Sequence, residues 1–245
     1  MNGELPQVDQ REGVAVAYAK GTSHRFYEDA FRMLSRDIPL VAQRNRGEVF
    51  AVFDGIGSAP EGRHSAQVMA DALVRFYREP ERYPVFEVGL IKILVTANMK
   101  ISSWGVVEGS NRSIGGCAGT VVWLLGEELH LFHAGDTSAV LIRDGLVKAL
   151  TREHQAEDGA IVRFFGIGQN FKMDVNKVNV EEGDRILLVS DGVTKCCTAL
   201  EAGDIVGDNP LIQNAVRDLV YQCKLAGVND DITAMLIEVE EFWID

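Results

Sequence analysis

Long apolar runs are missing from this sequence, which nowhere reaches the roughly 18 apolar residues that a membrane-spanning helix requires. The N-terminus also lacks the basic segment and apolar stretch that mark a secretory signal. Basic residues number 24 against 36 acidic ones, and the net charge of −12 disfavours binding to nucleic acids or anionic lipids. We therefore expect a cytoplasmic protein that binds neither nucleic acid nor membrane.

Cysteine is scarce too, since the 245 residues include four and none has C-x-x-C spacing. Four cysteines are too few for a disulfide framework in a chain of this size, which fits a reducing compartment. The adjacent Cys196-Cys197 could sense oxidants, but ordinary free thiols are the simpler interpretation. The five histidines lack the spacing and partner cysteines of a zinc site, and His130 and His133 are expected in the core or on the surface.

Two catalytic motifs are also absent. Without Gly-x-Ser-x-Gly or a Walker-type Gly-Lys-Ser/Thr, the sequence argues against a serine hydrolase and a P-loop nucleotide enzyme. Gly166 and Gly168 stand beside aromatic residues, but such a pair predicts a structural turn rather than a phosphate loop. No linker or repeat divides the chain, so we expect a single domain over residues 1–245.

Acidic residues, by contrast, gather in four clusters where apolar runs break into turns. These clusters are Tyr27-Glu28-Asp29, Phe53-Asp54-Gly55, Ser190-Asp191-Gly192 and Asn229-Asp230-Asp231. Carboxylates that a fold brings together repel one another unless a cation neutralises them, and their hard oxygen atoms favour Mg²⁺ or Mn²⁺. One Asp-Gly pair is usually a plain turn. Four clusters in order indicate a metal site.

Periodicity predicts strands and helices in an order typical of an α+β layered domain. The predicted strands cover residues 13–19, 48–53, 117–125, 128–133, 139–142, 173–180, 185–189 and 232–239. The predicted helices cover residues 61–78, 85–104 and 209–226, and the last ends at Gly227. We expect the strands between residues 117 and 142 to form a β-meander with turns at Gly126-Glu127 and Gly135-Asp136.

The order and flanking residues of the acidic clusters resemble those of the metal-dependent serine/threonine protein phosphatases of type 2C, the PPM family. The matching segments are Glu28–Ala30, Val49–Gly57, Gly119-Thr120, Ala134–Ser138, Gly183–Thr194 and Asp230–Thr233. As an ordered set they cover nearly the whole chain. The resemblance implies the family's fold, a four-layer αββα sandwich in which two antiparallel β-sheets pack face to face with helices on the outside.

The resemblance also implies a dinuclear site for Mn²⁺ or Mg²⁺. Asp54 matches the aspartate that bridges the two ions, and Gly55 matches the residue whose carbonyl binds the second ion. Asp191 and Asp230 match the terminal ligands of the first ion, while Asp231, where asparagine is usual, either supports the site or caps the turn in solvent. Two close cations neutralise a phosphoryl group and acidify a bridging water, which becomes the nucleophile. The three aspartates at positions 54, 191 and 230 are therefore the expected catalytic residues.

Further ligands follow from the same match. Glu28 corresponds to the acidic residue that serves the second ion, and Asp29 supports it through water. Asp136 and Asp191 together resemble the weaker third metal site of bacterial members. Lys195 stands where another acid is common, and we expect its charge to weaken that third site rather than the central pair, unless it points into solvent.

Other positions depart from the family pattern. His24 replaces the arginine that grips the substrate phosphate, and Arg25, one residue later, becomes the candidate for that contact. Ile56 replaces the histidine that is thought to protonate the leaving group in many eukaryotic members, which leaves this step to water or to a residue such as His64. The flap that helps to select substrates, at about residues 155–182, is shorter than in most members.

Together these matches imply a phosphatase of phosphoserine and phosphothreonine in proteins, which opposes a serine/threonine kinase in a bacterial cytoplasm. Two alternatives stay open. The departures at His24, Ile56 and Lys195 motivate a phosphatase-fold regulatory module that binds a phosphoprotein partner with little or no turnover. A reduced flap also fits a phosphatase of small phosphorylated metabolites. The complete ligand set argues against a pure binding module, which has no need of it.

Overall fold

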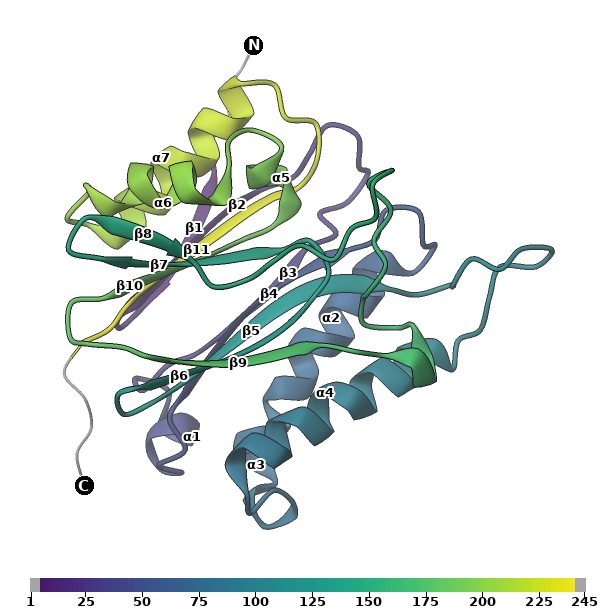
Figure 1. Ribbon diagram of the computed structural model, residues 1–245, viewed down its shortest axis with the longest axis horizontal. Helices are drawn as coiled ribbons and strands as arrows, with labels where there is room; N and C mark the ends of the chain where they lie inside the picture. Colours follow the sequence, from purple (N-terminus) through teal and green to yellow (C-terminus); the bar gives the residue numbers. More distant parts are fainter. Residues whose placement is uncertain (1–4, 241–245) are drawn as a thin grey trace. The chain divides into compact units, whose positions relative to one another are not determined.

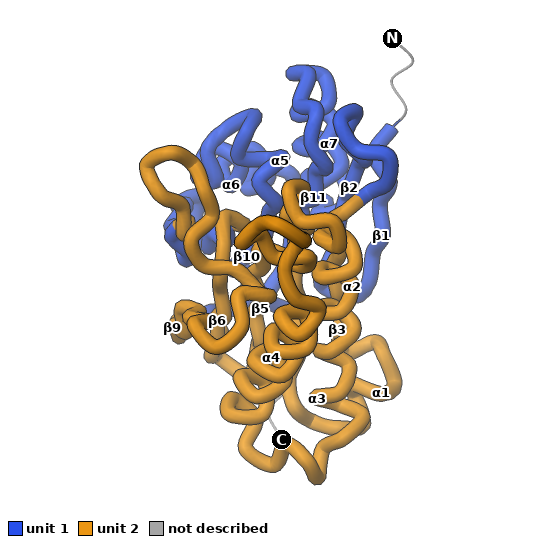
Figure 2. Tube along the Cα trace, turned by 90° about the vertical axis from the view of Figure 1, so that its right-hand side faces the viewer, with its two compact units in different colours: residues 1–27, 138–152, 179–245 blue, residues 28–137, 153–178 orange. Residues whose placement is uncertain are grey.

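The computed structural model describes residues 5–240 and divides the chain into two compact units. Unit 1 comprises residues 1–27, 138–152 and 179–245, and unit 2 comprises residues 28–137 and 153–178 (Figure 2). Each unit is built on its own antiparallel sheet (Figure 1). The expectation of a single domain over the whole chain remains a prediction.

Unit 1 contains a six-stranded sheet with the strand order β1-β2-β11-β10-β7-β8. These strands are β1 (Gln7–Arg11), β2 (Val14–Ala19), β7 (Ser138–Arg143), β8 (Leu146–Ala149), β10 (Arg185–Val189) and β11 (Ile232–Glu238). Alternate residues of the central strands, such as Ala15, Leu187 and Ala234, join one apolar cluster. The intervening residues, such as Val16 and Leu188, are buried as well, so the central strands exclude water on both faces.

The helices of unit 1 lie between β10 and β11 in the chain. They are α5 (Asp191–Thr194), α6 (Ala199–Gly207) and α7 (Ile212–Leu225). Helix α7 buries Val216, Leu219 and Val220 in the apolar cluster that β2 and β11 also form. The helix ends at Gly227, whose φ of +83° provides the predicted glycine stop.

Unit 2 contains a five-stranded sheet with the strand order β3-β4-β5-β6-β9. The strands are β3 (Ala30–Leu34), β4 (Glu48–Gly55), β5 (Cys117–Leu125), β6 (Glu128–Ala134) and β9 (Asp174–Asn179). Its helices are α1 (Pro39–Ala42), α2 (Gly62–Leu73), α3 (Arg75–Arg78), α4 (Phe86–Ser102) and the short 3₁₀ turns η1 (Pro80–Arg82) and η2 (Gly168–Asn170). Helices α2 and α4 bury Met69, Leu73, Leu90 and Leu94 against this sheet in one apolar cluster.

Two sequence predictions about these elements are wrong. The single helix expected over residues 61–78 is broken at Val74, whose N–H donates to the carbonyl of Asp71, so the turn tightens and α3 starts a new helix. The expected meander is split, because β5 and β6 pair in unit 2 whereas β7 pairs with β8 and β10 in unit 1. Gly135, with a φ of +113°, therefore turns the chain out of one sheet rather than into a hairpin.

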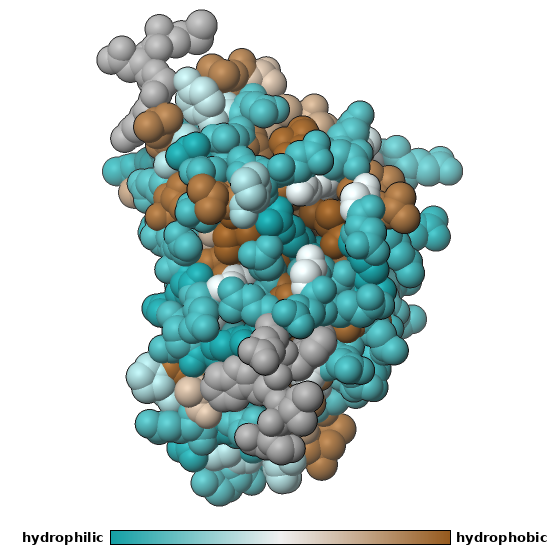
Figure 3. Space-filling view, turned by 90° about the vertical axis from the view of Figure 1, so that its left-hand side faces the viewer, coloured by the Kyte–Doolittle hydropathy of each residue, from teal (hydrophilic) through white to brown (hydrophobic). Residues whose placement is uncertain are grey.

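Exposed apolar side chains are dispersed. On the face shown in Figure 3, hydrophobic residues form small patches separated by hydrophilic ones. Among residues 5–240, no helix combines the length and the apolar character needed to cross a membrane.

Candidate metal centre

In unit 1, Asp191 and Asp230 stand at the junction of β10 and β11. Asp191 is the first residue of α5 directly after β10, and Asp230 lies two residues before β11. Backbone and side-chain bonds of 3.0 Å in both directions join Ser190 and Thr233 and fix this junction. A Cβ atom added to Gly192 would lie 2.0 Å from the carbonyl oxygen of Asp231, so only glycine permits this approach.

Lys195 corrects a sequence prediction. Its Nζ donates to Asp191 Oδ2 over 2.6 Å and also to Asp230 Oδ2. The ammonium therefore lies on the two carboxylates expected to bind the first metal ion, and it neither points away into solvent nor acts on the third site alone. Burial raises the pKa of Asp230, but the hydrogen bond and charge of Lys195 outweigh burial and leave that pKa below its usual range.

Asp231 is a buried support rather than a solvated turn residue. Its side chain is 2% exposed, and its Oδ1 accepts the N–H of Gly21 over 2.6 Å. Its Oδ2 lies 3.0 Å from Nδ1 of His24. The segment that carries His24 is held further by Ser23, whose N–H and hydroxyl both bond the carbonyl of Asn229. Sequence reasoning did not identify this link between the two segments.

In unit 2, strand pairing brings the first two acidic clusters together. Strand β3 pairs with β4 through Ala30 and Phe53, so the same register places Asp29 beside Asp54 and Glu28 beside Gly55. A Cβ atom on Gly55 would lie 2.9 Å from the carbonyl oxygen of Glu28 and 2.7 Å from the backbone of α2. The Glu28 segment and the Gly55 backbone therefore lie side by side in unit 2. Asp29 is buried, whereas Asp54 and Glu28 are half-buried.

Asp136 follows β6, which lies two strands away from β4 in the sheet of unit 2. Asp136 is buried, and Gln155 Nε2 donates to its Oδ2 over 2.9 Å. Burial, followed by the charge of Asp54, raises the pKa of the intervening Cys117 thiol well above its usual range. This thiol is therefore protonated at neutral pH.

A histidine missed by the sequence reasoning secures the turn before Asp136. The N–H of Gly135 donates to Nδ1 of His154 over 3.2 Å, and the N–H of His154 donates to the carbonyl of Gly135 over 2.8 Å. Nδ1 is thus the acceptor, so Nε2 carries the proton and faces Asp174 at 3.1 Å. Asp174 is also bound by Arg163. This network joins the start of the predicted flap to the turn.

The remaining predicted site residues have varied surroundings. Arg25 is exposed and its guanidinium lies 5.0 Å from the ring centre of Phe26. His64 is exposed and stacks on Trp104. His130 and His133 are both buried, as an assignment to the core predicts, and all four cysteines are free. Gly166 and Gly168 have positive φ values, which confirms a turn.

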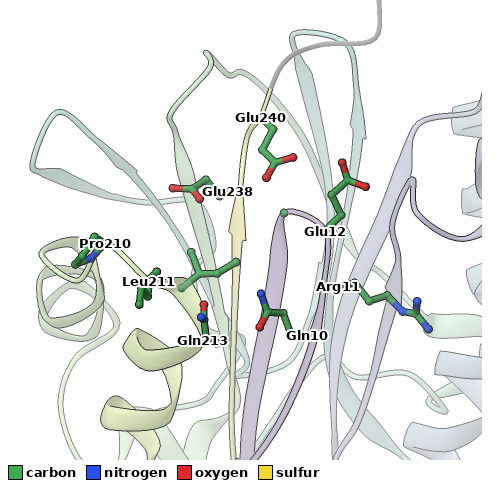
Figure 4. A pocket seen from close by; sticks show the side chains of 10 residues that line it. Gln10, Arg11, Glu12, Pro210, Leu211, Gln213, Glu238 and Glu240 are labelled. Atoms are coloured by element: carbon green, nitrogen blue, oxygen red, sulfur yellow. The ribbon is translucent and has the colours of Figure 1, made fainter.

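One pocket adjoins the acidic residues of unit 2, and another pocket lies apart from the acidic residues of unit 1. A pocket of about 420 Å³ in unit 2 adjoins Ile56, directly after Gly55, and is lined by the loops around Arg112 and Ile161. A pocket of about 600 Å³ in unit 1 lies between the β1–β2 turn and the start of α7 (Figure 4). Glu238 lines the second pocket at the end of β11 opposite Asp230, so this pocket is not part of the acidic site.

A divalent ion such as Mg²⁺ or Mn²⁺ needs several hard oxygen ligands that converge on one point. Within residues 5–240, no single group of three or more histidine, cysteine, aspartate or glutamate side chains is arranged to hold a metal ion. Each unit nevertheless offers hard oxygen donors. Asp191 and Asp230 converge on one cation in unit 1, while in unit 2 the Gly55 backbone, next to Asp54 in the chain, lies against the Glu28 segment. These residues fit Mg²⁺ or Mn²⁺ by ligand type.

The chain is similar to known proteins over most of its length. Residues 26–236 match the family described as protein phosphatase 2C. The probable protein phosphatase 2C 74 of Oryza sativa is 24% identical over 94% of this chain and 66% of its own length. The protein phosphatase PhpP of Streptococcus pneumoniae is 30% identical over 47% of this chain and 48% of its own length. The chain thus spans about half to two thirds of the length of these curated relatives.

Solved structures show the fold. The serine/threonine phosphatase PstP of Mycobacterium tuberculosis has a TM-score of 0.75 and 20% identity, and the match covers 93% of this chain and 98% of PstP. A further structure of the PstP catalytic domain contains two manganese ions. The predicted α+β class with two antiparallel sheets and helices is confirmed. Since the family match covers most of its residues, the chain belongs to the protein phosphatase 2C family of metal-dependent serine/threonine phosphatases.

Proposed function

We propose that this chain hydrolyses phosphoserine and phosphothreonine in proteins with the help of Mn²⁺ or Mg²⁺. The observation that carries this proposal is the convergence of Asp191 and Asp230 on one cation, Lys195. Two carboxylates that already share a monovalent cation offer the oxygen pair that a divalent ion takes. Family membership and the manganese bound by PstP support the same metal chemistry.

Each proposed ligand has a stated part in the reaction. Asp54 would be a ligand shared by the two ions, and the carbonyl of Gly55 would bind the second one. Asp191 and Asp230 would hold the first ion. Bound divalent ions supply charge that neutralises the phosphoryl oxygens and lowers the pKa of a bridging water, the proposed nucleophile. The protein residues therefore position charge, and no serine or cysteine nucleophile is required.

Other residues extend this site. Glu28 is proposed to serve the second ion and Asp29 to support it through water, as its burial beside Asp54 in the strand register allows. Asp136 and Asp191 are proposed to form a weak third site. Exposed Arg25 is the proposed contact for the substrate phosphate. The pocket beside Ile56 lies next to Gly55. It is therefore suited to bind the substrate residue that precedes or follows the phosphorylated residue.

We further propose that the substrate is a phosphoprotein of a bacterial cytoplasm and that the enzyme opposes a serine/threonine kinase. The similarity to PhpP of a bacterium and the acidic net charge of −12 support this assignment. We also propose a single catalytic domain with a shortened flap. The lysine on the ligand pair favours one alternative, a regulatory module that binds a phosphoprotein partner with weak or no turnover.

One assay separates these possibilities. The full chain, stripped of metal, is incubated with a phosphothreonine peptide or a phosphorylated sugar, in chelator or in Mn²⁺. The proposal predicts phosphate release from the peptide in Mn²⁺ alone, with little release from the sugar. Undiminished release in chelator would refute the metal-dependent mechanism. Peptide binding without release would establish the regulatory module, and preference for the sugar would establish the metabolite phosphatase.

A further inference from the structure

Lys195 joins two carboxylates that come from different strands of unit 1. Asp191 begins α5 directly after β10, whereas Asp230 precedes β11, the antiparallel neighbour of β10. The Nζ atom of Lys195 donates to Oδ2 of both residues. One ammonium therefore serves two negative charges at the position where the proposed function requires a divalent ion.

The backbone holds this pair of carboxylates in place. Ser190 and Thr233 bond one another on either side of the junction. The backbone N–H of Lys195 donates to the carbonyl of Asp191 over 2.8 Å, which fixes the turn that carries the lysine. The two carboxylates therefore stay close whether or not the lysine reaches them, and without a cation they repel one another.

The arrangement differs from an exposed surface pair such as Arg217 with Asp218. Those side chains are 40% and 49% exposed, and the pair contains one carboxylate. The two aspartates bound by Lys195 are 21% and 25% exposed, so water screens them less. His24 also faces this group, with its Nδ1 3.5 Å from Asp230 Oδ1, but its closer partner is Asp231 at 3.0 Å.

We propose that Lys195 is the resident cation of the Asp191–Asp230 pair, which a divalent ion enters only by displacing the lysine side chain. This inference rests on the proposed metal-dependent function and adds a regulatory property to the same site. Metal binding by this chain then occurs in two separate steps. The donors of unit 2 around Asp54 bind at low metal concentration, and the pair in unit 1 binds only at higher concentration.

Displacement is a rotation of the side chain and needs no proton transfer. Lysine carries several rotatable bonds, and its side chain here is 46% exposed, so Nζ can swing into solvent and leave both carboxylates to the ion. The ion must compensate the two lost charge-assisted hydrogen bonds, which lowers its apparent affinity. A neutral side chain of equal length at position 195 removes this competition.

The test measures metal binding directly. Mn²⁺ is titrated into the metal-free full chain, and free Mn²⁺ is followed by electron paramagnetic resonance, with calorimetry as a second readout. The variants are Lys195→Met, Lys195→Arg and the control Lys148→Met, which removes an exposed lysine of the same unit with the same change in net charge. We expect two separated steps in the wild type, the Lys195→Arg variant and the control.

In Lys195→Met the second step should move to a Mn²⁺ concentration at least about tenfold lower, which corresponds to about 1.4 kcal/mol. Overlapping titration curves for Lys195→Met and the wild type, with Mn²⁺-dependent turnover in both, would overturn this inference and leave the proposed function intact. The absence of Mn²⁺ binding to both proteins at millimolar concentration would overturn the function as well, and the inference with it.

A stability measurement covers the case in which Lys195→Met folds poorly. In chelator, loss of the lysine leaves two close carboxylates without their cation, so urea should unfold this variant at lower concentration than the wild type. Saturating Mn²⁺ should abolish that difference, and Lys195→Gln should behave in the same way. If Mn²⁺ stabilises both variants no more than it stabilises the wild type, Lys195 is an ordinary surface residue and the inference is wrong.

Discussion

Small residues determine how closely the acidic residues of unit 1 approach one another. Gly192 and Gly21 both touch the backbone of residues 229–231, where a Cβ atom would lie 2.0 Å and 2.4 Å from a carbonyl oxygen. The sequence predicts a sharp turn at Gly192 but gives no sign of what the glycine contacts. At Gly21 no acidic neighbour in the sequence marks the contact at all.

Gly192→Ala should separate Asp191 from Asp230. The added methyl group cannot fit against the backbone of Asp231, so we expect a loss of about 2–4 kcal/mol in unfolding free energy together with loss of the second Mn²⁺ binding step, the one assigned to unit 1. Gly207→Ala is the control, because its Cβ atom would meet Ile142 at an ordinary 3.4 Å. Urea denaturation and a Mn²⁺ titration check both variants. Equal behaviour of the two variants would contradict the close approach.

Asp231 contacts the buried Gly21 and the half-buried His24, and two substitutions separate the effect of its acceptor oxygen from that of its charge. Asp231→Ala leaves the N–H of Gly21 without its acceptor and should cost about 2 kcal/mol. Asp231→Asn keeps an acceptor oxygen in the same position and should recover most of that loss. Urea denaturation in chelator measures both variants. The interpretation fails if the asparagine variant is as unstable as the alanine variant.

Cys197 tests whether the adjacent thiols act as oxidant sensors. Burial, followed by the neighbouring charges of Cys196 and Glu201, raises the pKa of the Cys197 thiol to about 11. The reactive thiolate is therefore rare at neutral pH. As long as the pH stays below that pKa, the thiolate fraction rises about tenfold for each unit by which the pH rises. Alkylation of the native chain, located by mass spectrometry, should show this slope for Cys197 between pH 7 and 10. Fast, pH-independent labelling at pH 7 would point to a sensor instead.

At the scale of elements, apolar periodicity predicts well the strands and helices that have one continuous pattern. Strands β5, β10 and β11 and helix α4 lie within a few residues of their predicted bounds. Strand β1 was not predicted because all of its residues are exposed and its polar sequence has no alternation. Helix α6 was not predicted either, since two glycines interrupt its pattern. A capping box at Thr198 and Glu201 marks its start.

The split of the meander shows why pairing is harder to predict than the strands themselves. Residues 128–143 read as two strands around a Gly-Asp turn, which is a common hairpin signal. The partners of β7, however, are β8 and β10, and β10 lies more than 40 residues further along the chain. Long-range partners leave no mark in local sequence. For the same reason, the spacing of four between Asp191 and Lys195 was visible, whereas the contact with Asp230 was not.

The loops around the pocket beside Ile56 should affect peptides more than small substrates. Ile161→Trp would fill part of this pocket of about 420 Å³, so we expect KM for a phosphopeptide to rise by about tenfold while turnover of an aryl phosphate stays unchanged. Val162→Trp is the control, because Val162 is exposed and does not line the pocket. Steady-state kinetics with both substrates provide the check. An equal rise in KM for both substrates would show that the pocket does not contribute to the selection of peptides.

At the scale of the whole molecule, the proposed ligands are divided between two units. Asp54 belongs to unit 2 and Asp191 to unit 1, and the two residues are 137 positions apart in the sequence. The family resemblance predicts both residues from their flanking motifs, and each motif falls at the end of a strand as expected. Sequence spacing alone gives no reason to associate them.

Removal of either carboxylate should stop the reaction. We expect Asp54→Ala and Asp191→Ala each to lower kcat by several orders of magnitude, because each change deprives an ion of a ligand. Asp204→Ala removes an exposed carboxylate of α6 and should retain full activity. Circular dichroism verifies that each variant is folded. Near wild-type turnover by a folded Asp54 or Asp191 variant would show that the metal centre is assigned to the wrong residues.

The order of strands in unit 1 also bears on how the protein is made. Strand β11 lies between β2 and β10 and is synthesised after both of them. Until residues 232–238 emerge, β2 has no inner neighbour and the sheet stays open. The sheet of unit 1 therefore cannot close before residues 232–238 have been synthesised. A nascent chain that ends before residue 230 lacks half of the Asp191–Asp230 pair, and the junction that fixes this pair also requires Thr233.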